Sequence, residues 1–426
     1  MKKLALLVAA SLVSSSVLAE KIAIVGGKVF TMSEQGTLDE GTVLMTDGKI
    51  DRVISGATAP DGYTVIDAAG KVVTPGLVGS MTSLGLVEVS SSAGVVDSST
   101  EASPITRTGA ALDVSYAVNP DSSLVGVTRI EGMTSAATSI TYTDNLFYGQ
   151  GAVITLDGDA PVLKPRAFMV VNVGADGAHE AGGTRAALWV MLENVLEEAA
   201  SVSGKISATQ EWHGLNTPAD VSALKAVLSG DMPLLMEADR ASDIRQVIAF
   251  KQRHSNIDVV LMHGVEAWRV ADELAAADIP VILDPEYNLP GGFDQMGATL
   301  ANAARLEAAG VTVAVGMDTH NIRLATQHAG NAVANGLSYE GGLASLTRAP
   351  ASILGVDDKL GSLATGKRAD VVIWSGDPLE VTQVAEQVFV NGEAIEMESR
   401  QTRLRDRYLA VQEEQAKTPT HFVRPE

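Results

Sequence analysis

The chain has 426 residues and no cysteine. Disulfide bonds, thiol chemistry and a lipid anchor on an N-terminal cysteine are therefore excluded. Aromatic residues are also few, at 4% of the chain, although apolar residues in total make up 46%. The fold must consequently be stabilised by its apolar core. A chain of this length favours one large domain with a smaller companion, or two domains.

Apolar runs long enough to cross a bilayer are missing too, because no stretch approaches about 18 uninterrupted apolar residues. No membrane span is therefore predicted. The N-terminus instead has Lys2 and Lys3, a short apolar stretch over residues 4–13, and small residues up to Ala19. This is the pattern of a secretory signal peptide over residues 1–19. We expect a mature chain that begins near Glu20 and resides in the periplasm.

Basic residues are in the minority, since the chain has 31 Lys and Arg but 52 Asp and Glu, which gives a net charge of −21. Such a surface repels phosphate backbones, so no nucleic-acid partner is expected. Solubility of an exported enzyme explains the acidity best. No Gly-x-Gly-x-x-Gly motif follows a strand, which removes the usual dinucleotide site. A Gly-x-Ser-x-Gly nucleophile elbow is absent as well.

Both ends of the chain have the pattern of short strands joined by tight turns. Asp47-Gly48 lies between two alternating segments near the N-terminus, and Asn391-Gly392 does the same near the C-terminus. These dipeptides are strong hairpin signals. We predict that the two ends share one small β-sandwich, formed by residues 20–75 and 359–398.

Between these ends, apolar runs alternate with helical segments, which favours an α/β fold, a (β/α)₈ TIM-like barrel over residues 76–358. Four units are clear in the second half. Their predicted strands are 233–236, 258–262, 279–283 and 311–315, and their helices are 242–253, 266–277, 297–309 and 325–335. In the first half, the predicted strands are 72–81, 134–140 and 167–173, with a helix over 123–131. Residues 399–426 form a polar tail.

Three segments carry a resemblance to a known family. They are Val73-Thr-Pro-Gly-Leu-Val78, Asn331-Ala-Val-Ala-Asn-Gly-Leu337 with Pro350-Ala-Ser-Ile-Leu-Gly355, and the stretch from Leu360 to Trp374. Together they resemble the imidazolonepropionase-like branch of the amidohydrolase superfamily, over roughly residues 21–395. The resemblance implies a barrel with a divalent metal at its C-terminal mouth. The metal makes water a better nucleophile and an amide carbon a better electrophile.

The ligand positions of that family carry over only in part. The histidine pair at the end of strand one falls on Met81 and Ser83, neither of which is a plausible ligand. This departure argues against a two-metal site and favours a single ion, for which zinc is the first choice. The family's strand-four lysine has no clear counterpart, because Lys164 and Lys205 lie in the right interval without following a recognisable strand.

Two further positions come from strands five and six. Glu237 stands where the family has the strand-five histidine, and a carboxylate can also bind metal or act as a catalytic acid. The alternative is an ion pair of Glu237 with Arg240 or Arg269. His263 falls at the strand-six histidine position, and its alternative is a hydrogen-bonded structural histidine.

The strand-eight position falls on Asp318, which matches the family aspartate that binds metal and takes the proton of the attacking water. Its alternative is a cap on the following helix. His320 follows in the same loop, as a predicted substrate-binding residue or a solvent-facing one. His179 and His213 are extra candidates for ligands and are more simply explained as surface residues.

Two functions remain open at this point. The first is a hydrolase of C–N bonds other than peptide bonds, or of small dipeptides and cyclic amides, with one metal held by Glu237, His263 and Asp318. The second is a metal-free periplasmic binding protein, or the non-catalytic subunit of an amidohydrolase complex, which the residues Met81 and Ser83 favour. The expected partner is a small amide or cyclic amide, and a homo-oligomer is left open. Substrate specificity is expected in the loops 87–112, 142–151 and 285–295.

Overall fold

The computed structural model describes residues 21–88, 96–100, 106–158, 160–207 and 209–417. The predicted signal peptide, parts of the serine-rich loop around residues 90–100 and the end of the tail lie outside the described residues. Among the described residues, none of the helices has both the length and the apolar character that crossing a membrane requires.

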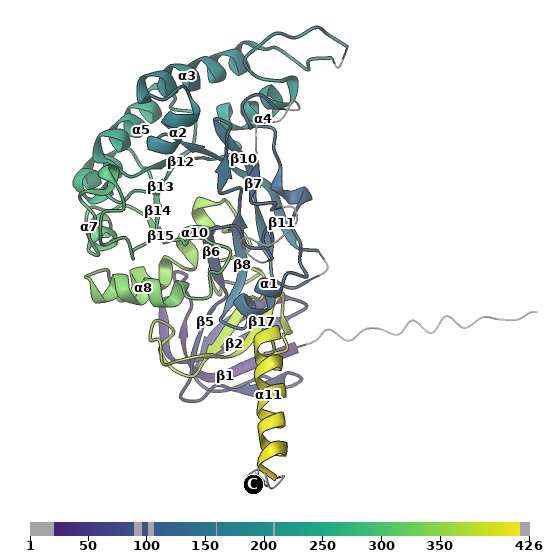
Figure 1. The fold of residues 1–426 in the computed structure, drawn as a ribbon. Coiled ribbons are helices and arrows are strands. Elements are labelled where there is room, and N and C mark those ends of the chain that lie inside the picture. Colours follow the sequence, from purple (N-terminus) through teal and green to yellow (C-terminus); the bar gives the residue numbers. More distant parts are fainter. Residues whose placement is uncertain (1–20, 89–95, 101–105, 159, 208, 418–426) are drawn as a thin grey trace, which may run out of the picture.

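Strands from both ends of the chain share one sheet, which is drawn below the second sheet in Figure 1. Its strands are β1 (Lys21–Phe30), β2 (Thr37–Thr46), β3 (Lys49–Ser55), β4 (Thr64–Asp67), β5 (Val72–Pro75), β16 (Val371–Trp374), β17 (Ala385–Val390) and β18 (Glu393–Ala394). Strand β16 pairs antiparallel with β5 and joins the two ends. The predicted domain boundaries, and the sandwich itself, stay predictions.

The two hairpin turns form as their dipeptides predict. Asp47 and Gly48 have φ values of 52° and 73°, and Asn391 and Gly392 have 55° and 82°. Two consecutive left-handed residues are what a two-residue hairpin loop requires, and Asp-Gly and Asn-Gly tolerate this backbone best. The first turn joins β2 to β3 and the second joins β17 to β18.

The middle of the chain forms a second eight-stranded sheet, in the order β6-β8-β10-β11-β12-β13-β14-β15. Its strands are β6 (Leu77–Thr82), β8 (Met133–Thr138), β10 (Phe147–Thr155), β11 (Val162–Asn172), β12 (Leu234–Ala238), β13 (Val259–His263), β14 (Val281–Leu283) and β15 (Val313–Val315). The sheet is nearly closed. The Ser80 hydroxyl donates to the carbonyl of Val315 at 2.7 Å, and Thr82 bridges to Thr319 in the loop after β15.

The first half of this sheet departs from the predicted (β/α)₈ pattern. Strand β10 runs antiparallel to both β8 and β11, and the described residues between these three strands contain no helix. The predicted loop over residues 142–151 was wrong, because it contains β9 (Tyr142–Thr143) and half of β10. The segment Gly149-Gln150-Gly151 resembles a loop in composition, yet every residue of β10 is buried. The predicted strand 167–173 belongs to β11, the fourth strand of the sheet.

Helices cover the outer face of the second sheet, as Figure 1 shows for α3, α5 and α7. The larger ones are α3 (Arg185–Ser201), α4 (Pro218–Leu228), α5 (Ala241–Arg253) and α8 (Ala325–Ala334). Shorter ones are α1 (Ser123–Arg129), α2 (Ala175–Glu180), α6 (Ala271–Ala276), α7 (Asn302–Ala308), α9 (Tyr339–Ala344) and α10 (Arg348–Ile353). The predicted helices 242–253 and 325–335 are thus confirmed within one residue, whereas the predicted helices 266–277 and 297–309 are shortened to α6 and α7. The tail forms α11 (Arg400–Lys417), which extends away from both sheets.

A packed apolar cluster fills the interior of the second sheet. Every strand contributes to it, for example Phe168 and Val170 at alternate positions of β11, and Leu235 on β12. Each fully buried aliphatic or aromatic side chain of this kind stabilises the fold by about 1.5–3 kcal/mol. Because side chains alternate along a strand, a residue two positions after an interior residue faces the same side of the sheet. At the carboxyl end of a strand, such a side chain faces the mouth of the barrel.

Candidate active site

A cavity of about 590 Å³ lies at the carboxyl ends of strands β11 to β15. The ends of parallel strands meet at one edge of a sheet, so the residues that follow them converge. The side chains that matter here are those of Tyr148, Asn172, Asp176, Glu237, Asp239, His263, Tyr287, Phe293, Asp294, Gln295 and Asp318. Three predicted site residues, Glu237, His263 and Asp318, therefore share one cavity wall.

Glu237 faces the cavity because it lies two positions after the interior residue Leu235. It pairs in register with Asn172 on β11, whose Nδ2 donates to Glu237 Oε2 at 2.8 Å. Burial raises the pKa of Glu237, the charge of His263 opposes this, and the charge of Asp318 adds to it. The alternative of an ion pair was wrong. Arg240 pairs with Asp243 and Arg269 with Glu266, and neither pairs with Glu237 among the described residues.

His263 reaches the cavity through an unusual backbone. Val260 and Met262 belong to the interior cluster, so regular alternation would turn His263 toward the helices. Instead His263 has a φ of 68° and is followed by Gly264 at 58°. A left-handed residue other than glycine costs about 1–3 kcal/mol, and such strain is concentrated at functional sites.

The charge of His263 is set by the acidic residues around it. Burial disfavours the imidazolium, but the carboxylates outweigh burial and raise the pKa of His263, with Glu237 contributing most. The ring stacks on Tyr287 at 6.5 Å between centroids. The imidazole ring of His263 forms no hydrogen bond with the described residues, so the alternative of a hydrogen-bonded structural histidine is not supported.

Asp318 lies in the loop after β15 and is exposed to the cavity. Its charge raises the pKa of both Glu237 and His263. The alternative of a helix cap was wrong, because the next helix, α8, has Leu324 as its N-cap and no side-chain capping bond. His320 is half-buried nearby and is not one of the residues that line the cavity, so its substrate-binding role stays a prediction.

Several cavity residues were missed by sequence reasoning. Tyr148 lies on β10, a strand that was not predicted, and burial together with nearby carboxylates raises its pKa. Asn172 ends β11, where an apolar run gives way to a polar side chain. That change was the available signal, and it was overlooked because a lysine was sought. Asp239 follows β12 and accepts a hydrogen bond from Gln295 Nε2 at 2.7 Å.

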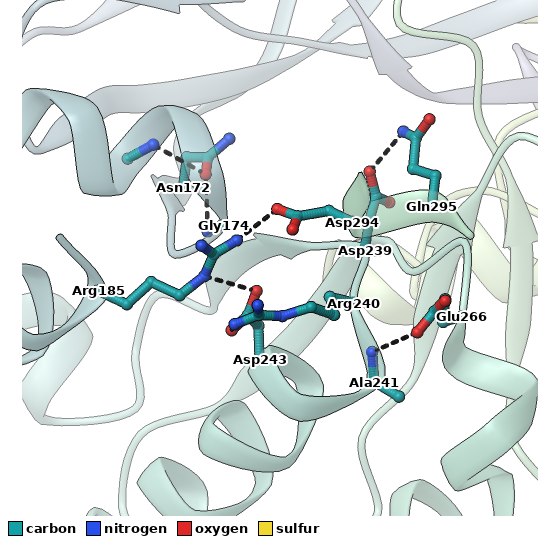
Figure 2. A network of polar contacts seen from close by, with 11 residues as sticks. Asn172, Gly174, Arg185, Asp239, Arg240, Ala241, Asp243, Glu266, Asp294 and Gln295 are labelled. Carbon is teal, nitrogen blue, oxygen red and sulfur yellow. Dashed lines mark hydrogen bonds and ion pairs between the residues drawn. The ribbon is translucent and has the colours of Figure 1, made fainter. Parts of the chain in front are cut away.

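A polar network fastens the loop over residues 285–297 beside the cavity (Figure 2). Arg185 Nε donates to Asp243 at 2.9 Å, and the same guanidinium pairs with Asp294 of the loop. Gln295 is held by Asp239, as described above. The loop also places Phe293, which is 92% exposed, at the cavity. The predicted specificity loop is thus anchored at its end and carries an apolar side chain into solvent.

The remaining sequence candidates lie elsewhere. Lys164 Nζ donates to the carbonyls of Leu354 and Gly355 at 2.9 and 3.2 Å, outside the cavity. Lys205 and His179 are exposed and do not line the cavity. His213 is exposed and contacts Glu211. The structure therefore assigns none of these four residues to the site.

Known proteins were compared with the chain. Residues 235–395 match the model of the Amidohydrolase family. An amidohydrolase from Thermotoga maritima MSB8 superimposes with a TM-score of 0.77 at 25% identity, covering 88% of this chain and 99% of that one. The family-model match over this part of the chain and the structural similarity both point to the amidohydrolase superfamily.

The other matches have lower TM-scores or cover a small part of the chain. A Xaa-Pro dipeptidase matches with a TM-score of 0.57 at 15% identity, over 88% of this chain and 100% of that one. A molinate hydrolase matches with 0.55 at 17% identity, over 96% and 98%. The amidohydrolase tasK of Hapsidospora irregularis is 46% identical over 59 residues, which are 14% of this chain and only 6% of that protein. These distant structural matches support the fold.

Members of the superfamily generally use divalent metals, so the side chains were tested for a metal site. Met81 and Ser83, at the strand-one ligand positions, are each only 3% exposed, and Met81 packs in the interior cluster. Within the described part of the chain, no three His, Asp or Glu side chains are arranged so that they could hold a metal ion. The predicted zinc site of Glu237, His263 and Asp318 therefore does not fit these positions.

Proposed function

We propose that this protein cleaves C–N bonds of small amides, cyclic amides or dipeptides, with water activated by its own carboxylate and imidazole groups. The observation that carries the proposal is the convergence of Glu237, His263 and Asp318 on one cavity at the strand ends. No step is assigned to a metal, because the described donors do not gather into a metal site.

Glu237 is the general base of this proposal. A base must be ionised at the working pH and yet bind a proton well, so a carboxylate with a raised pKa is better suited than an exposed one. Burial raises the pKa of Glu237. The hydrogen bond from Asn172 occupies Oε2, which leaves Oε1 to accept the proton of an attacking water.

His263 is the general acid. Its raised pKa keeps the imidazolium populated nearer neutral pH, and the leaving nitrogen of an amide must be protonated before the C–N bond breaks. The charge of Asp318 raises the pKa of His263 and so supports its positive charge. The phenol of Tyr148 also borders the cavity and, as a neutral donor, is suited to polarise the substrate carbonyl.

The cavity also restricts the substrate class. Its volume of about 590 Å³ suits a small molecule. Carboxylates outnumber the single imidazole on its walls, which disfavours substrates with a net negative charge near the scissile bond. The structural relatives named Xaa-Pro dipeptidase and molinate hydrolase make dipeptides with C-terminal proline and thiocarbamates sensible members of the first screen.

A turnover screen tests the proposal. The mature protein would be incubated with dipeptides, N-acyl amines, cyclic amides and thiocarbamates, and amine release would be followed with His263→Gln beside the parent. His179→Gln is the matched control, because His179 is exposed and outside the cavity. Turnover that falls in His263→Gln and persists in His179→Gln supports the proposal. Equal turnover in all three proteins contradicts it.

The second candidate is a binding protein or non-catalytic subunit that retains the cavity. Buried Met81 and Ser83 at the strand-one positions favour it, because the family's ligands there are replaced by side chains that cannot substitute for them. Thermal stabilisation by a screened amide, with no amine release at any pH, would decide for this candidate.

Export and assembly are proposed separately from the chemistry. The N-terminal pattern supports a periplasmic protein, which cell fractionation would test. A homo-oligomer stays a proposal that light scattering on the mature protein would check.

A further inference from the structure

Asn172 connects the end of β11 both to helix α2 and to Glu237. Its Oδ1 accepts hydrogen bonds from the backbone N–H groups of Gly174 at 2.8 Å and Gly177 at 3.1 Å. Its Nδ2 donates to Glu237 Oε2 at 2.8 Å. Figure 2 shows Asn172 beside Gly174. The side chain thus lies between a helix start and the proposed base.

These contacts fix the orientation of the amide. A backbone N–H can only donate, so the group of Asn172 that faces Gly174 and Gly177 must be the oxygen. The amide nitrogen therefore has to face Glu237. A flipped amide would oppose N–H to N–H on one side and oxygen to carboxylate on the other, and would lose all three bonds.

The backbone around Asn172 is built for this close approach. A Cβ at Gly177 would lie 1.8 Å from the carbonyl oxygen of Asn172 and 2.6 Å from its carbonyl carbon. Only glycine lets α2 begin this close to the end of β11. The register Asn172 to Glu237 between β11 and β12 sets the other side of the contact.

We propose that Asn172 is a positioning residue that aims the carboxylate of Glu237 into the cavity. The inference rests on the proposed function insofar as Glu237 is the base. Among the described residues, Oε1 of Glu237 accepts no hydrogen bond. The donation from Asn172 holds Oε2 and turns Oε1 toward the cavity, where the reacting water would lie. Asn172 also lines the cavity and has a side-chain hydrogen bond with Tyr148, but the proposed role is exerted through Glu237.

The substitution Asn172→Asp separates positioning from support of α2. Aspartate has the same shape and still accepts from Gly174 and Gly177, so the start of α2 is retained. It cannot donate, so it places a second carboxylate against Glu237. We expect kcat to fall about a hundredfold with KM unchanged, since small displacements of a catalytic group cost this much. A role confined to α2 predicts kcat equal to that of the parent.

Asn216→Asp is the matched control. Asn216 Nδ2 also donates to a glutamate, Glu198, at 2.8 Å, and neither residue lines the cavity. The substitution therefore creates the same pair of facing carboxylates away from the site. Its kcat is expected to stay at the parental value, which would show that a facing pair of carboxylates alone does not abolish activity.

A second measurement needs no turnover. In the double variant Asn172→Asp with Glu237→Gln, the amide of the new glutamine can donate to the new aspartate, so the hydrogen bond is restored in the opposite direction. We expect Asn172→Asp alone to lower Tm by about 2–4 °C and the double variant to recover it. Recovery of Tm in the double variant, together with a parent protein that has no hydrolase activity, would support the contact and refute the proposed function. Parental Tm and kcat in Asn172→Asp would overturn the inference.

Discussion

Replacement of Glu237 by glutamine gives the sharpest prediction for the proposed chemistry. Glutamine has the same length, and its carbonyl oxygen can still accept the hydrogen bond that Asn172 Nδ2 donates at 2.8 Å. The geometry of β12 is therefore kept while the base is lost. General base catalysis contributes about 10²–10⁴ in rate, so kcat should fall by about that factor.

The same variant should gain stability, with a definite pH dependence. Burial raises the pKa of Glu237 in the folded protein above the usual range of a glutamate. A carboxyl with a raised folded-state pKa contributes its full stability below the unfolded pKa and loses it as the pH rises through the folded pKa. Because glutamine never ionises, the variant should have a higher Tm than the parent at pH 8, and this advantage should shrink toward pH 4.

Amine release tests the predicted loss of kcat, and thermal unfolding tests the predicted change in Tm. Both are measured at several pH values. Glu193→Gln is the control, since Glu193 pairs with Arg253 and His254 away from the cavity. That variant should keep parental turnover. A Glu237→Gln protein with turnover close to that of the parent would refute the role of Glu237 as base. A Tm below that of the parent at pH 8 would refute the account of its burial.

Three further predictions concern Asp318, Gly177 and Asp220. Asp318→Asn should shift both limbs of the pH–kcat profile to lower pH, because the charge of Asp318 raises the pKa values of the base Glu237 and the acid His263; unshifted limbs would contradict this. Gly177→Ala should lower kcat and Tm together, since its Cβ would lie 1.8 Å from the backbone of Asn172; kcat and Tm equal to those of the parent would show that α2 needs no such approach. Asp220→Ala should lower the free energy of unfolding, measured in urea, by about 3 kcal/mol. The reason is that the fully buried carboxylate accepts four hydrogen bonds, which come from Thr106, Arg107, Ala111 and Thr217. A decrease of less than about 1 kcal/mol would contradict this network.

The second half of the barrel could be predicted because local and global signals agree there. Each strand is a short apolar run that ends in a polar residue before a helix, and parallel strands bring such ends together. Glu237, His263 and Asp318 were found in this way. The ion-pair alternative for Glu237 failed because Arg240 has a nearer acid, Asp243, three residues away on the same helix.

The first half could not be predicted for physical reasons that a local pattern does not contain. Strand β10 is buried along its whole length by neighbours on both sides, so its two glycines and one glutamine are compatible with a strand only in that context. Tyr148 was lost with it. The left-handed backbone of His263 is equally invisible in the sequence, because histidine gives no glycine-like signal. The altered metal site that Met81 and Ser83 indicate stays a prediction.

The metal requirement of turnover tests the central claim most directly. The mature protein, purified without a metal-affinity tag, would be stripped with a chelator, its metal content measured by plasma mass spectrometry, and its amine release compared with untreated protein. The account predicts equal turnover by the stripped and untreated proteins, and loss of turnover in Glu237→Gln under both conditions. Turnover that disappears with the metal and returns with added zinc would contradict it.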